Sequence, residues 1–202
     1  MGAHSGLFCL QATDCCLCGN KAVNDLTTLN KYHQQNVEVL YTKDTSTTAD
    51  QSDVEHFKKL SSSNPRKRIR LCTHPNQGDL LHEMLIVHEK SAYVRPHKHP
   101  GKSESIHIIE GFVDVVLFDD EGRIERVISM GDYASGKTFY YRMATPVFHT
   151  LVIRSEVLVF HETTNGPFDR TATLFAPWAP EDADLNSVVD FMVDLEKRVS
   201  LI

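Results

Sequence analysis

The segment from His97 to Gly111 combines residue types and a spacing that could bind a metal ion. His97, His99, Glu104 and Gly111 form the pattern H-x-H-x4-E-x6-G. Two histidines two positions apart on a strand point to the same face, because side chains alternate along a strand. After a turn at Pro100-Gly101, Glu104 can reach the same place from the next strand, and Gly111 permits a tight hairpin. Two imidazoles and a carboxylate suit a divalent first-row transition metal.

This spacing resembles the first motif of the cupin family, G-x5-H-x-H-x3,4-E-x6-G, and departs from it only at the leading glycine, where Ser91 stands. The family's second motif, P-x-G-x2-H-x3-N, resembles the stretch around His149, although Ala144, Pro146 and Ile153 replace its proline, glycine and asparagine. The resemblance implies that His149 is the fourth ligand. The alternative, surface or core histidines without a metal, is the weaker interpretation because three residues at the family spacing are followed by the expected glycine.

A closer resemblance, from about residue 37 to about residue 197, is to the WbuC-type cupin-fold metalloproteins, a family without a settled reaction. The segments that carry it are residues 66–72, 82–85, 93–99, 166–168 and 175–180. It implies a cupin fold and one divalent transition metal ion, which could be iron, manganese, zinc, nickel or cobalt. It says little about the substrate, because one fold supports many functions.

The spacing of apolar residues and turn signals agrees with this resemblance. We expect an all-β fold, a cupin jelly-roll barrel with a short N-terminal helix and a C-terminal helix. The expected parts are a poorly ordered N-terminal extension (1–36), a lead-in strand and short helix (37–66), the barrel (67–180) and the C-terminal helix (181–202). Within them we expect a strand at 37–41, a helix at 53–60 capped by Ser52 or Asp53, and a helix at about 181–199 with one apolar face. Strands are expected at 68–72, 81–88, 93–99, 103–109, 112–118, 123–129, 139–143, 150–154 and 156–162.

Strand parity suggests further residues in the cavity of the barrel. Tyr93 and Arg95 share the parity of His97 and His99, so a regular strand would project all four side chains into one cavity. A buried guanidinium needs a partner. That partner could be a carboxylate or phosphate of the substrate, or an acidic side chain of the protein. We therefore treat Tyr93 and Arg95 as candidate substrate-binding residues.

Tyr141 and Glu162 are two further candidate substrate-binding residues, because both belong to strands in the second half of the predicted barrel. A structural hydrogen bond or an exposed position is the alternative for each. Alternation lets only one of His161 and Glu162 face inward. No residue stands out as a catalytic base, so the catalytic residues are left unassigned.

The net charge and the lengths of the apolar stretches restrict which classes of partner the protein could bind. The chain has 202 residues and a formal net charge of −6, which argues against a general nucleic-acid-binding protein. The run Arg66, Lys67, Arg68 and Arg70 is a local exception. It is either a solvated edge before a strand or a phosphate or carboxylate site at the barrel mouth. No apolar stretch is long enough to span a membrane, so no membrane partner is expected.

The cysteines and the N-terminus favour a cytoplasmic protein. Five cysteines are an odd number without a recognisable zinc spacing, which is typical of reduced thiols in the cytosol. Modification of Cys15, Cys16 or Cys18 by acylation or oxidation is the alternative. The first residues lack a basic segment followed by a long apolar one, so no secretory signal is expected.

Two classes of function fit these features. The first is a metal-dependent enzyme that acts on a small anionic or saccharide-type molecule by isomerase, lyase or dioxygenase chemistry. The second is a non-catalytic module in which the metal helps to bind a saccharide or only stabilises the barrel. Cupins commonly pair through barrel edges, so the resemblance also implies a homodimer.

Overall fold

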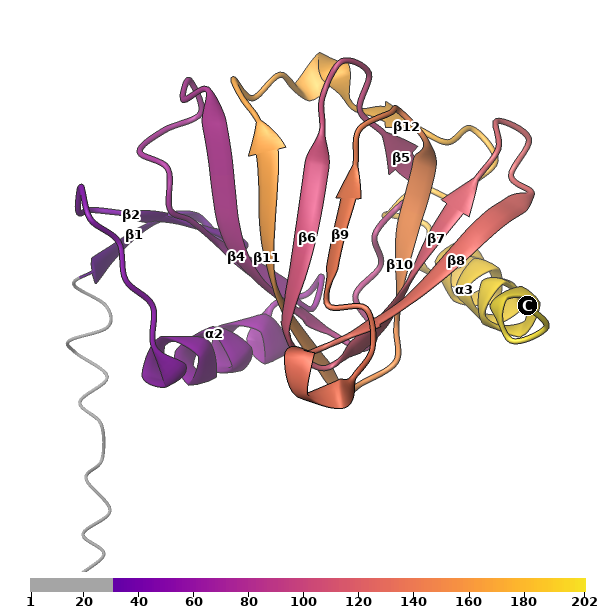
Figure 1. Ribbon diagram of the computed structural model, residues 1–202, viewed down its shortest axis with the longest axis horizontal. Coiled ribbons are helices and arrows are strands. Elements are labelled where there is room, and N and C mark those ends of the chain that lie inside the picture. The colour runs from indigo at the N-terminus through magenta and orange to yellow at the C-terminus, as the bar shows by residue number, and fades with distance from the viewer. Residues whose placement is uncertain (1–30) are drawn as a thin grey trace, which may run out of the picture.

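Strands dominate the secondary structure of residues 31–202, which are the residues that this computed structural model describes (Figure 1). The expected order of strands with one helix before and one after the barrel is confirmed. In chain order the elements are β1 (Tyr32–Asn36), β2 (Val39–Thr42), α2 (Gln51–Ser63), β3 (Arg68–Cys72), β4 (Leu81–Glu89), β5 (His97–Lys98), β6 (Glu104–Glu110), β7 (Phe112–Phe118), β8 (Ile124–Gly131), β9 (Tyr140–Met143), β10 (Phe148–Ile153), β11 (Val157–Asn165), β12 (Leu174–Phe175) and α3 (Leu185–Val199), with single 3-10 turns at Tyr133–Ser135 and Arg170–Ala172.

The strand order identifies a jelly roll. Strands β4-β11-β6-β9 are neighbours in a seven-stranded sheet that β3, β2 and β1 extend, and β5-β10-β7-β8 are neighbours in a five-stranded sheet that ends at β12. From β4 to β11 the chain therefore changes sheet at every step except the β7–β8 hairpin. This alternation is the double Greek key of a jelly-roll barrel, so the expected jelly-roll fold is confirmed.

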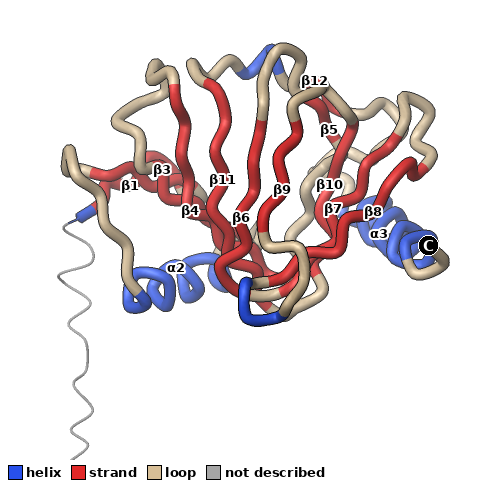
Figure 2. Tube along the Cα trace, in the orientation of Figure 1, coloured by secondary structure: helices blue, strands red, loops and turns tan. Residues whose placement is uncertain are grey.

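Three apolar clusters hold the layers together. The largest fills the space between the two sheets and includes Ile106, Leu151 and Phe160. A second cluster, with Phe57 at its centre, seals α2 against the outer face of the seven-stranded sheet. A third holds α3 against the outer face of the five-stranded sheet, where Leu195 is fully buried. The helices thus cover opposite sides of the barrel, as the blue segments in Figure 2 show.

Several expected boundaries differ from the structure. Helix α2 is longer than predicted and is capped by Asp50 rather than by Ser52 or Asp53, because Asp50 accepts from the Asp53 amide while Asp53 accepts from the Asp50 amide. Helix α3 begins at residue 185 rather than at 181, and Asp184 is its N-cap.

Two other differences concern strands. Residues 32–36 form β1, although the sequence predicts poor order for 1–36, and residues 1–30 of that prediction lie outside the described residues. The strand predicted for 93–99 shrinks to two residues, because 93–96 pair with no strand. β12 was not predicted from the sequence.

Candidate metal centre

The four predicted ligands come from three strands and meet inside the barrel. His97 lies on β5, His99 directly follows β5, Glu104 begins β6 and His149 lies on β10. Antiparallel pairing of β5 with β10 places His97 opposite His149, and their ring centroids are 4.5 Å apart. The His97–His99 centroids are 4.8 Å apart and the His99–His149 centroids 6.2 Å. Between β5 and β6 the chain turns at Gly101, whose φ is +76°.

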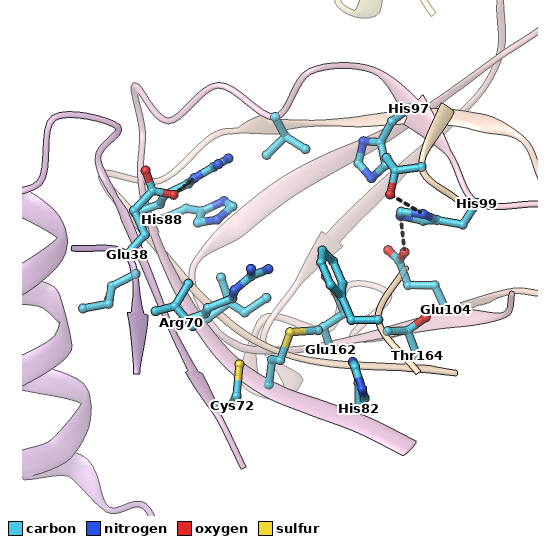
Figure 3. Close-up of a pocket in the computed structure, with 18 of the residues that line it drawn as sticks. Glu38, Arg70, Cys72, His82, His88, His97, His99, Glu104, Glu162 and Thr164 are labelled. Carbon is cyan, nitrogen blue, oxygen red and sulfur yellow. Dashed lines mark hydrogen bonds and ion pairs between the residues drawn. The ribbon is translucent and has the colours of Figure 1, made fainter. Parts of the chain in front are cut away.

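Glu104 lies between two of the imidazoles. One of its carboxylate oxygens is 3.7 Å from His99 Nε2 and the other is 3.6 Å from His149 Nε2. Figure 3 shows the side chains of His97, His99 and Glu104 turned toward one another at one side of the pocket. The carboxylate and the imidazole nitrogens therefore face a common space.

Hydrogen bonds at the other ring nitrogens orient the histidines. Nδ1 of His97 and Nδ1 of His149 each contact the backbone carbonyl two residues earlier, at 2.8 and 3.0 Å. A carbonyl only accepts, so both Nδ1 atoms carry a proton and Nε2 is the ring nitrogen left to bind a metal ion. Nδ1 of His99 is 3.2 Å from the Thr173 hydroxyl. Such outer contacts are typical of metal-binding histidines, because they fix the tautomer and the ring orientation.

The electrostatics of the site favour one ionised carboxylate beside two neutral imidazoles, those of His97 and His99. Burial opposes the charge of Glu104, but the hydrogen bond and charge of His149 and the charges of the other two histidines outweigh it, so its pKa falls to about 2. Burial lowers the pKa of His97 to about 3 and also lowers that of His99. Burial opposes protonation of His149 too, yet Glu104 raises its pKa overall. Three of the four groups therefore already have the protonation state of a metal ligand.

The four side chains have the donor atoms that a metal ion requires, but these atoms lie slightly too far apart to bind one ion as they stand. No group of three or more His, Cys, Asp or Glu side chains among residues 31–202 is close enough to hold an ion as the side chains stand. Two ligand atoms about 2.1 Å from one ion lie about 3.0–3.4 Å apart. The Glu104 contacts of 3.6 and 3.7 Å exceed this range by a few tenths of an ångström. Small side-chain rotations would therefore bring these donors to ligand distance.

The four side chains border a cavity of about 730 Å³ that opens between the two sheets. A cavity of this size can enclose a small organic molecule. Its wall continues from the candidate ligands past Glu162 and Thr164 to Arg70 and His88 on the far side. Figure 3 shows this second group of polar side chains across the pocket from His97 and His99.

Glu162 lines the cavity, as a candidate substrate-binding residue should. On β11 the side chains of Phe160, Glu162 and Thr164 line the cavity. His161 points away and lies 3.9 Å from Glu83. Burial and the nearby charge of Glu104 raise the pKa of Glu162 to about 8, although Arg70 acts in the opposite direction. This carboxyl therefore holds a proton near neutral pH in the metal-free protein.

The prediction that Tyr93 and Arg95 project into the cavity is wrong. Neither lines it. The Tyr93 hydroxyl donates to the Pro180 carbonyl at 3.0 Å. The Arg95 guanidinium lies 5.0 Å from the centre of the Phe175 ring and 3.8 Å from Glu181. The parity argument fails because residues 93–96 are not a strand, so their side chains do not alternate.

Tyr141 also lies outside the cavity wall. It is half-buried on β9, pairs with Ile106 of β6 and packs against the cluster between the sheets. Its role in the structure is therefore packing, which differs both from substrate binding and from the structural hydrogen bond or exposed position that the sequence left open.

Arg70, His88 and Thr173 belong to the site but were not assigned to it from the sequence. For Arg70 a signal existed, because it belongs to the basic run and has the same strand parity as Cys72, which also lines the cavity. Cys72 is a buried free thiol whose pKa is raised by burial. The other four cysteines lie outside the described residues.

Comparisons with known proteins give partial matches. Residues 49–130 match the model of a family described as a domain of unknown function, DUF6016. No curated protein matches the sequence. Among solved structures, an oxalate decarboxylase of Bacillus subtilis studied for its Mn(II) centres is 19% identical, with a TM-score of 0.39. A formate complex of the Lactobacillus farciminis oxalate decarboxylase is 14% identical, with the same TM-score.

Each alignment covers 48% of this chain but only 24% of the first structure and 27% of the second. The chain thus spans about a quarter of the length of those proteins. The fold assignment therefore depends on the strand order. In addition, none of the helices within residues 31–202 is long and apolar enough to cross a membrane.

Proposed function

We propose that this chain is a cupin-type metalloprotein of the WbuC kind that holds one divalent transition metal ion through His97, His99, Glu104 and His149. The observation that carries the proposal is the meeting of these four groups in one cavity, with the Nε2 atoms of His99 and His149 on either side of an ionised carboxylate. Three imidazoles and a carboxylate suit iron, manganese, cobalt, nickel or zinc.

We propose further that the cavity binds a small anionic or saccharide-type molecule next to the ion. When bound, a divalent ion would act as a Lewis acid toward an oxygen of that molecule. The chain itself would supply a protonated carboxyl at Glu162, whose pKa of about 8 lets it give or accept a proton near neutral pH. Isomerase, lyase and dioxygenase chemistry are all compatible with this arrangement.

The second candidate is a non-catalytic module in which the metal helps to bind a saccharide or only stabilises the barrel. It is supported by the hydrogen-bonded Nδ1 atoms, which would serve a structural site equally well. The cavity of about 730 Å³ argues against a purely structural ion, which needs no space beside it, and is compatible with both an enzyme and a saccharide-binding module. A homodimer and a cytoplasmic location remain predictions.

Metal content tests the proposal. Purified protein loaded with each candidate ion in turn should bind one ion per chain by elemental analysis. His99→Ala should lower this stoichiometry at least tenfold at limiting metal, because it removes an imidazole ligand. His107→Ala is the matched control, since His107 is an exposed residue of the same β-barrel outside the cavity wall. Equal metal content in the wild type and His99→Ala would overturn the ligand assignment.

Activity measurements separate the two candidate functions. The loaded protein would be incubated with a panel of sugar nucleotides and small acids and followed by NMR, with oxygen uptake recorded for the iron form. Turnover that is lost in His99→Ala supports the enzyme. Binding shifts without turnover support the binding module. A folded, metal-loaded protein without shifts or turnover across the panel supports the structural role.

A further inference from the structure

The basic run at residues 66–70, which leads into and forms part of β3, contains three arginines that differ in their charged partners. Arg68 Nε lies 2.9 Å from the Glu38 carboxylate. Arg66 contacts the same carboxylate at 3.4 Å and Asp182 at 3.0 Å. Within residues 31–202, Arg70 makes no side-chain hydrogen bond and no ion pair. Two of the three guanidiniums are therefore neutralised by the protein, and the third has no protein counter-charge.

The direction of the Arg70 side chain follows from its strand. Ile69 and Leu71, its neighbours on β3, are buried in the cluster beneath α2. Alternation turns Arg70 to the opposite face, where it lines the cavity together with Cys72. Figure 3 shows the Arg70 guanidinium reaching into the pocket. Glu162 lines the same cavity, yet no ion pair joins it to Arg70 in this structure.

His88 supplies a second polar atom without a partner at the same end. It lies on β4, is 7% exposed and lines the cavity, and its Nδ1 is buried without a hydrogen-bond partner. A buried donor without a partner is destabilising unless a ligand or water satisfies it. Burial and the charges of Arg68 and Arg70 keep this imidazole neutral, so it can donate one hydrogen bond without adding charge.

We propose that Arg70 and His88 form an oxyanion-binding subsite, which receives the carboxylate or phosphate of a small molecule whose other end lies at the metal centre. The guanidinium provides the charge and a two-pronged set of donors, and the His88 ring provides one further donor. The part of this inference that concerns the other end of the ligand depends on the proposed function. The subsite itself does not, because its residues are separate from the four candidate metal ligands.

The size of the cavity limits the ligand class. About 730 Å³ exceeds the space that a bare anion occupies, and both groups of polar residues line the same cavity. A sugar phosphate or a sugar acid has an oxyanion at one end and hydroxyl or carbonyl oxygens at the other. Such a molecule matches an arginine at one end of the cavity and metal-ligand side chains at the other.

Dissociation constants for matched sugars test the subsite. Glucose 6-phosphate, glucuronate and glucose would be titrated by calorimetry into wild type, Arg70→Gln, Arg70→Lys and Arg123→Gln, with and without metal. The control Arg123 is an exposed residue of the β7–β8 hairpin that pairs with Asp119, away from the cavity. Metal content of each variant is measured in parallel, and circular dichroism reports folding.

The wild type should bind at least one charged sugar more tightly than glucose, and the preferred one identifies a phosphate or a carboxylate as the ligand group. Arg70→Gln should weaken that binding about 30-fold, which corresponds to about 2 kcal/mol. Arg70→Lys should lose less, because it keeps the charge, and Arg123→Gln should bind as the wild type does. Metal content should not change in any of these variants.

Two results would overturn the subsite: equal affinity of Arg70→Gln and the wild type, or charged sugars binding no more tightly than glucose. Metal content and anion affinity are measured separately, so a failure of the subsite can be distinguished from a failure of the metal proposal. If the protein binds no metal but loses the anion in Arg70→Gln, the subsite stands and the metal centre does not. If metal binds and the anion does not depend on Arg70, the reverse holds.

Discussion

Replacing His88 by asparagine should make the protein less sensitive to acid. The His88 imidazole is buried, and its pKa falls to about 3, from 6.5, because of burial first and then the charges of nearby arginines. The unfolded chain takes up the proton near its ordinary pKa of about 6.5, whereas the folded protein does not until about pH 3. Stability linked to His88 is therefore complete above pH 6.5 and is lost as the pH falls from there toward 3.

The size of the effect follows from these two values. At about pH 6 the wild type should lose about 0.8 kcal/mol through this residue, and at about pH 5 about 2 kcal/mol. Other histidines with lowered pKa values, such as His97, add to the total loss. They are present in both proteins and cancel in the difference between wild type and His88→Asn. The variant avoids the loss because asparagine does not titrate.

Urea denaturation in a chelating buffer at about pH 7.5, 6 and 5 measures this difference, since the free energy of unfolding follows from the midpoint and slope. The stability of His88→Asn relative to the wild type should rise by about 2 kcal/mol across that range. A relative stability that stays constant would mean that His88 titrates normally in the folded protein. His88 would then be charged rather than a neutral donor whenever the pH lies below about 6.5.

Two further predictions concern the fold. Gly111→Ala should cost about 2–4 kcal/mol in urea denaturation, because Gly111 has a φ of +93° and a Cβ there would lie 2.4 Å from Ser155 Oγ and from the Val157 carbonyl oxygen. Gly136→Ala, also at positive φ but in open space, should cost only about 1 kcal/mol, so equal losses would refute the clash. Phe57→Ala should cost about 3–5 kcal/mol, because this 1% exposed side chain seals α2 against the sheet, and a loss below 1 kcal/mol would contradict that role.

Local sequence signals were enough to predict much of the barrel. The strands at 68–72 and 112–118 have the bounds that alternation and turns predicted. His97, His99 and Glu104 could be placed together because one turn and one strand separate them. His149 required the family resemblance, since nothing local marks a partner from β10 that pairs across the sheet with β5.

The predictions for Tyr93 and Arg95 were wrong because residues 93–96 do not form a regular strand. Pro96 removes a backbone donor, and the chain before His97 is held instead by contacts with the C-terminal segment, such as that of Tyr93 with Pro180. Arg95 and Arg70 could not be ranked from the sequence. They differ because Glu181 lies 3.8 Å from Arg95, whereas Arg70 forms no ion pair within residues 31–202.

The charges around the cavity also restrict its ligand. Of two carboxyls that line the cavity, Glu104 at the metal centre is ionised, and Glu162 is held protonated near neutral pH while no cation is present. With a divalent ion bound as proposed, the ion and Arg70 would leave the cavity positively charged at both ends. That excess would favour ionisation of Glu162, or entry of an anionic ligand that replaces it as the counter-charge. An anion that binds near Arg70 would therefore let Glu162 keep its proton, which is the state in which this carboxyl can donate to the bound molecule.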